Sequence, residues 1–130
     1  MVLDLQRDKR LLRLERGSAL IEGTVALAIA FLLLALVVHV GLFVAARSTA
    51  EAAVGSAARR AARPGATVGG DDLVALIEAS VIGSTNVTAS VSSDQQQAVT
   101  VASFVWNPPG PSFGTIRMTV RASEPIVVPP

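Results

Sequence analysis

The chain has 130 residues, a formal net charge of +1 and no cysteine. This length suffices for one membrane anchor and one small domain, and the small net charge gives no reason to expect a nucleic-acid partner. The lack of cysteine excludes disulfides, thiolate catalysis and zinc–cysteine sites. Hydrophobic residues make up 51% of the chain, and they are concentrated in its first half. From Pro64 onward Ser, Thr, Val, Gly and Pro predominate.

A basic leader, residues 1–17, precedes an apolar run. Its first 16 residues hold five Lys or Arg against three Asp or Glu. The 24 residues from Gly23 to Ala46 contain no Asp, Glu, Lys or Arg, and a helix of ~17–25 apolar residues crosses a bilayer. Because basic residues are enriched on the cytoplasmic side, we expect a single-pass protein of the cytoplasmic membrane, with its N-terminus inside and its C-terminus outside.

The apolar helix is predicted to continue beyond the membrane, so that residues 18–63 form one helix about 69 Å long. Alanines recur at the three-and-four spacing of one helix face, and Pro64 with Gly65 ends the pattern. Small residues allow close helix packing. The expected packing positions for a partner helix are Gly41, Ala45, Ala50, Ala53, Ala57 and Ala61.

Residues 64–130 are expected to form a small extracytoplasmic head. Residues 65–70 read as a linker, and Asp71 or Asp72 can cap a short helix. Three runs then alternate with period two, as in a half-buried sheet. Their alternating apolar positions are Val87, Ala89 and Val91, then Val99, Val101 and Val105 (against Thr100, Ala102 and Phe104), then Ile116, Met118 and Val120. The predicted fold is α+β, with a long N-terminal transmembrane helix extended beyond the membrane, a short helix and a small three-stranded antiparallel sheet.

One carboxylate, Glu22, lies at the start of the apolar run, five positions after Gly17. An ionised group inside a spanning helix costs about 2.5–3.5 kcal/mol at the centre and less near the end, and such groups normally have a partner. If the chain were cut after Gly17, Ser18 would carry a new α-ammonium group. That amine on one subunit could pair with Glu22 of the next and set the axial register.

A glycine followed five positions later by glutamate, between a basic leader and an apolar helix, resembles the prepilin-peptidase site of type IV pilin-like proteins. Residues 16–62 as a whole are similar to the TadE/TadG-like family of Tad (Flp pilus) pseudopilins. The positions that match the family pattern are Gly17, Glu22, Gly41 and the pair Ala58-Arg59. At His39 the chain departs from it, because the family often has an acidic residue there.

The resemblance implies a pseudopilin or minor pilin-like subunit that takes part in bacterial Tad pilus assembly and adhesion. A prepilin peptidase would cleave between Gly17 and Ser18, and Glu22 would orient processing or subunit register. The implied partners are the membrane, this peptidase, other Tad pilins and pseudopilins, and the assembly-platform proteins. After processing the subunit would be associated with the pilus.

Two alternatives are open at this point. The first is an unprocessed single-pass protein whose extracytoplasmic head binds a partner. The second is a conventional secretory signal peptide, which is disfavoured because the apolar run is longer than the apolar core of such a peptide. The sequence contains no Ser/His/Asp set, no clustered carboxylates outside the membrane and no phosphate-binding loop. We therefore expect no enzyme, no cofactor and no metal site. His39, the single histidine, is expected to be neutral and bonded to a neighbouring helix.

Overall fold

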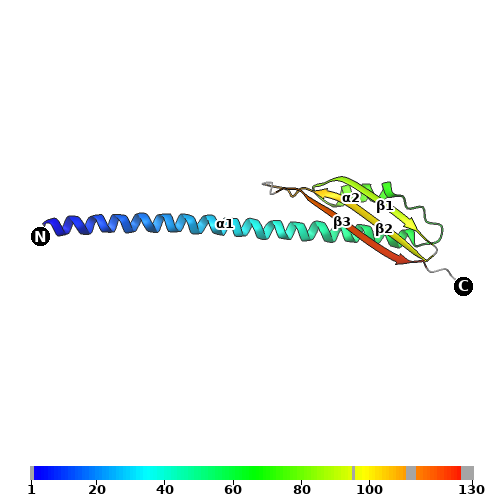
Figure 1. Ribbon diagram of the computed structural model, residues 1–130, viewed down its shortest axis with the longest axis horizontal. Helices are drawn as coiled ribbons and strands as arrows, with labels where there is room; N and C mark the ends of the chain where they lie inside the picture. Colours follow the sequence, from blue (N-terminus) through cyan, green and yellow to red (C-terminus); the bar gives the residue numbers. More distant parts are fainter. Residues whose placement is uncertain (1, 95, 111–113, 127–130) are drawn as a thin grey trace. The chain divides into compact units, whose positions relative to one another are not determined.

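Figure 1 shows the computed structural model of the chain. It describes residues 2–94, 96–110 and 114–126, with their side chains from residue 18 onward. The predicted α+β fold, with its long apolar helix, short helix and three-stranded antiparallel sheet, is confirmed. The elements in chain order are α1 (Val2–Ala61), α2 (Gly70–Ser80), β1 (Ser84–Ser93), β2 (Gln97–Trp106) and β3 (Ile116–Pro125).

Helix α1 begins at Val2, so the backbone of the basic leader is helical as well, and it ends at Ala61, two residues before the predicted end. Its end follows from Pro64, because proline disfavours helical backbone at the residue before it. Contacts divide the chain into two compact units, Met1–His39 and Val40–Pro130. The boundaries that composition predicts, after residue 17 between leader and helix and after residue 63 between helix and head, lie elsewhere in the chain than this division.

The described part of the first unit, residues 2–39, consists of helix alone, and from Gly23 onward it carries no charged side chain. Its large side chains are mostly more than half exposed, such as Leu20 at 73% and Leu32 at 66%. The segment Ser18–Ala61 is long and apolar enough to cross a membrane, and its most apolar window is not buried by the rest of the chain. A helix of this kind needs lipid or other apolar surfaces around it.

The second unit contains the sheet, in the order β1-β2-β3 with antiparallel neighbours. At one end of the sheet Trp106 pairs with Ser84 on one side and with Ile116 on the other. At the opposite end Ser93 pairs with Ala98. The β1–β2 register shifts between Thr85 and Thr88, where Asn86 has a φ of 51°.

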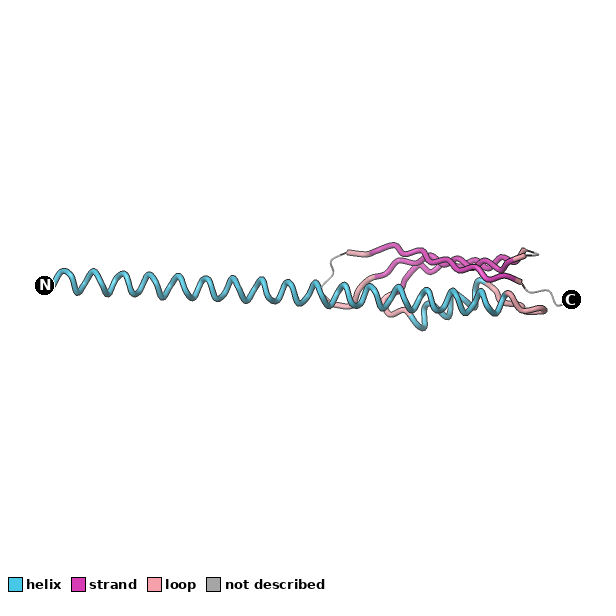
Figure 2. The backbone as a smooth tube through the Cα atoms, turned by 90° about the horizontal axis from the view of Figure 1, so that it is seen from below, coloured by secondary structure: helices cyan, strands magenta, loops and turns pink. Residues whose placement is uncertain are grey.

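The helices of this unit, α2 and the part of α1 after residue 39, lie on one face of the sheet (Figure 2). They share one core with it, whose fully buried large side chains include Phe104, Leu73, Ile77 and Val54. The predicted alternation of β2 is confirmed, but its fully buried face carries Thr100, Ala102 and Phe104, whereas Val99, Val101 and Val105 are only half-buried on the other face.

Candidate functional site

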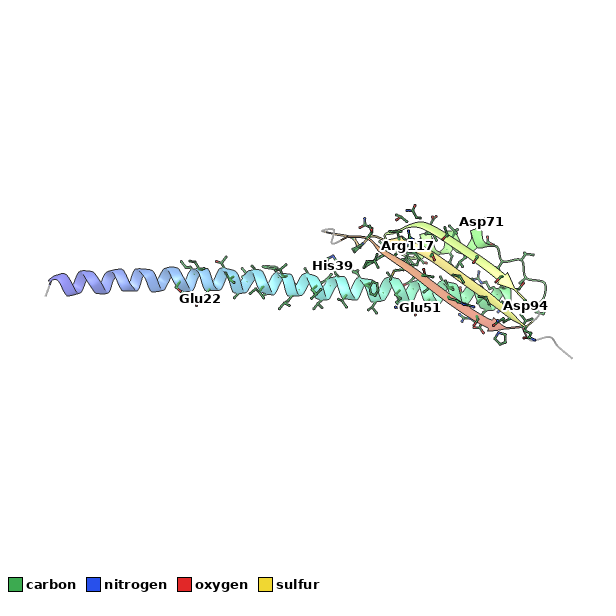
Figure 3. The ribbon with its side chains drawn as sticks, in the orientation of Figure 1. Glu22, His39, Glu51, Asp71, Asp94 and Arg117 are labelled. Atoms are coloured by element: carbon green, nitrogen blue, oxygen red, sulfur yellow. The ribbon has the colours of Figure 1, made fainter. Side chains whose placement is uncertain are left out.

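Glu22 projects from α1 as an exposed carboxylate (Figure 3). The hydroxyl of Ser18, one turn earlier, donates a hydrogen bond to Glu22 Oε1 at 3.1 Å. Among the described side chains no basic group forms an ion pair with Glu22. The carboxylate therefore keeps most of its capacity to accept hydrogen bonds, and a partner from outside the chain can reach it.

The peptide bond between Gly17 and Ser18 lies within the helical backbone of α1. In a helix each N–H bonds to the carbonyl four residues earlier, so a peptidase that takes this segment in extended form must first unwind it locally. Glycine in a helix interior costs about 1 kcal/mol relative to alanine. Gly17 therefore lowers the free energy needed to unwind the proposed cleavage site.

The predicted alanine face is buried, but by the chain itself. Ala50, Ala53 and Ala57 are 0%, 7% and 3% exposed and belong to the core formed with α2 and the sheet. The expectation that a partner helix packs on these positions is therefore corrected: the chain's own head occupies them. The remaining predicted packing positions are less covered, since Ala61 is half-buried and Gly41 and Ala45 are exposed.

The ring of His39 lies against its own helix. Its Nδ1 is 2.8 Å from the carbonyl oxygen of Ala35, one turn earlier. The sequence predicted a bond from His39 to a neighbouring helix, and this stays a prediction. Within the described residues no group of three or more His, Cys, Asp or Glu side chains is placed to hold a metal ion.

A cluster that sequence reasoning did not anticipate lies where α1 enters the second unit. Phe43 contacts Trp106 edge-to-face, with ring centroids 5.9 Å apart, and Trp106 Nε1 donates to the carbonyl oxygen of Ile82 at 3.1 Å. The only signals in the sequence were that Phe43 comes one turn before the first charged residue after the run, Arg47, and that Trp106 ends a strand. Neither signal by itself indicates that the two rings meet.

No family model, curated protein or solved structure matches the chain. The resemblance to TadE/TadG-like pseudopilins therefore depends on the leader, the glycine–glutamate spacing and the apolar helix quoted above.

Proposed function

We propose that the protein is a Tad-type pseudopilin or minor pilin-like subunit, cut by a prepilin peptidase after Gly17 and assembled through its N-terminal helix. The observation that carries the proposal is the exposed carboxylate of Glu22 at the start of a 24-residue uncharged helical run. No described basic side chain neutralises it. A group so placed is expected to have a partner.

Cleavage would supply that partner. The new α-ammonium group of Ser18 is a cation, and Ser18 lies one turn from Glu22 on the same face of α1, where their side chains are 3.1 Å apart. In a bundle of parallel helices, an axial shift brings the amine of one subunit near the carboxylate of another. The pairing neutralises both charges in an apolar environment, where ionised groups are costly when unpaired.

The exposed apolar helix supports the same function. Side chains such as Leu32, Leu36 and Val37 are 60–67% exposed, so they need a cover of lipid or protein. Lipid covers them while the subunit is in the membrane, and helices of neighbouring subunits would cover them in a filament. A subunit that moves from membrane to filament must have a helix that suits both environments, as this helix does.

The deciding experiment measures the intact mass and N-terminal sequence of the protein recovered from its native membrane. A chain that starts at Ser18 supports the proposal. A chain that retains residues 1–17 favours the alternative, an unprocessed single-pass protein whose head binds a partner.

A second experiment separates assembly from insertion. Glu22→Ala is expected to insert normally and to reduce pilus output strongly, because the register-setting ion pair is lost. Glu51→Ala is the matched control, since Glu51 is an exposed carboxylate on the same helix that already pairs with Arg47 at 2.8 Å. Normal pilus output from Glu22→Ala, or equal losses from both variants, would contradict the role assigned to Glu22.

A further inference from the structure

The head begins to pack on α1 before the uncharged run has ended. Leu42 and Phe43 are partly buried against the core of the second unit, and the first charged residue after Glu22 is Arg47. The 24 uncharged residues make about 36 Å of helix, which is ~6 Å more than the hydrocarbon core of a bilayer. We place this excess at the C-terminal end of the run, next to the charged Arg47, so that the last turn of the run, which includes Phe43, lies in the interfacial layer.

One end of the sheet is attached to that turn. Trp106 contacts Phe43 through its ring and holds the carbonyl group of Ile82 through its indole N–H. Ile116, the first residue of β3, is directly paired with Trp106 in the sheet. We call Phe43, Trp106, Ile82 and Ile116 the Trp106 end of the head. Its depth relative to a membrane follows from the position of Phe43.

The Trp106 end exposes apolar side chains. Ile82 is 79% exposed and Ile116 is 44% exposed. Among the described residues outside α1, these two and Leu76 of α2, which is 38% exposed, are the exposed large hydrophobic side chains. Since burial of apolar surface contributes about 25 cal/mol per Å², contact with the acyl-chain boundary would stabilise this end.

Two arginines lie beside Ile116 at this end of the head. Arg47 and Arg117 line a shallow groove of about 160 Å³ together with Phe43 and Ile116. Arg47 is paired with Glu51, whereas Arg117, at the start of β3 (Figure 3), has no acidic partner among the described residues. Glu78 on α2 does not line this groove. An exposed guanidinium group without a carboxylate partner suits a phosphate, which it can bind with two parallel hydrogen bonds.

We propose that the Trp106 end docks on the membrane surface: Ile82 and Ile116 enter the interfacial layer, and Arg117 binds phosphates of anionic lipids. The binding partner of the Trp106 end is thus the lipid headgroup layer. The head is thereby held upright at the bilayer, with the Ser93 end of the sheet pointing away from it. The proposal requires a membrane span but neither processing nor assembly, so it stands or fails independently of the pilus function.

The chain has no cysteine, so single-cysteine variants of the full chain can be labelled with a fluorophore. We would compare Ile116→Cys and Ile82→Cys with the control Ser93→Cys. Ser93 is an exposed residue nine positions after Ser84 on β1, which is about 30 Å along the strand. The labelled chains are reconstituted, at less than one chain per vesicle on average, in phosphatidylcholine–phosphatidylglycerol vesicles that contain nitroxide-labelled lipid.

Strong quenching at positions 82 and 116, with little at position 93, is the expected result. Little quenching at all three positions overturns the proposal, because the head then stands clear of the lipid or needs a protein partner at this end. Equal strong quenching at all three also overturns it, because the head then lies flat on the bilayer.

The role of the arginine is tested by comparing Arg117→Gln with Arg121→Gln. Arg121 lies on the same face of β3, four residues further from the Trp106 end, which is two periods of the side-chain alternation. With the probe at position 116, Arg117→Gln should lower the docked-to-undocked ratio about fivefold in anionic vesicles, which corresponds to ~1 kcal/mol for one arginine at an anionic surface. It should have little effect in pure phosphatidylcholine. Equal effects of the two substitutions, or none in anionic vesicles, would overturn the assignment to Arg117.

Discussion

Replacement of Thr100 by valine should stabilise the head. Thr100 lies in the middle of β2, is 0% exposed and faces the core, and its Oγ1 has no hydrogen-bond partner. A buried polar group without a partner costs about 1–3 kcal/mol. Valine has nearly the same shape without the hydroxyl group, so we expect Thr100→Val to raise the free energy of unfolding by about 1–2 kcal/mol.

The assay is urea unfolding of the full chain in detergent micelles, followed by the fluorescence of Trp106, the single tryptophan, which is 2% exposed in the folded head. With a denaturant slope of about 1.5 kcal/mol per M, the midpoint should rise by about 1 M. Thr119→Val is the surface control, because Thr119 is exposed and its hydroxyl lies 2.9 Å from that of Ser103. A lower midpoint for Thr100→Val would refute the reasoning and indicate that the hydroxyl is satisfied, for example by buried water.

Two further substitutions test the packing of the head in the same assay. Ala57→Leu should destabilise the head by about 1–3 kcal/mol through overpacking, because Ala57 is 3% exposed. The control Ala52→Leu, on the exposed face of α1, should change stability by less than about 0.5 kcal/mol. Equal effects of the two substitutions would show that the sheet does not cover this face. Gly83→Ala should cost several times more than Gly65→Ala, because both residues have positive φ but only at Gly83 would the added Cβ meet a backbone atom, the carbonyl oxygen of Asn107. Similar losses at the two glycines would mean that the loops relax.

Much of the fold was predictable because its signals are local. The run from Gly23 to Ala46 predicts an apolar helix through its lack of charge, and Pro64 predicts where that helix stops. The short helix was also predicted, and the observed bond from the backbone N–H of Gly69 to Asp72 Oδ2 at 3.2 Å places one of the two proposed capping residues at its start. Such patterns act over a few residues, so they do not depend on the rest of the molecule.

The candidate site was predictable only in part. Glu22 and Gly17 are recognisable from their spacing and their position at the edge of the apolar run, and the role proposed for them stays a prediction. The alanine positions Ala50, Ala53 and Ala57 were recognised as a packing face, but the sequence pattern does not name the surface that covers it. A stripe of small residues fits a neighbouring helix, another subunit or the chain's own sheet equally well.

The sequence by itself determined the kinds of elements, their order and the position of a carboxylate at the start of the apolar run, because charge, periodicity and proline act locally. Only the tertiary structure decided which faces meet. In β2 the valine face and the Thr100 face are both apolar enough to be buried, and strand pairing decides between them. Val101 lies opposite Arg121 and Ala102 lies opposite Val120, and paired residues share a face of the sheet. Arginines favour solvent over an unpaired position in the core, so Ala102 and Thr100 face the helices.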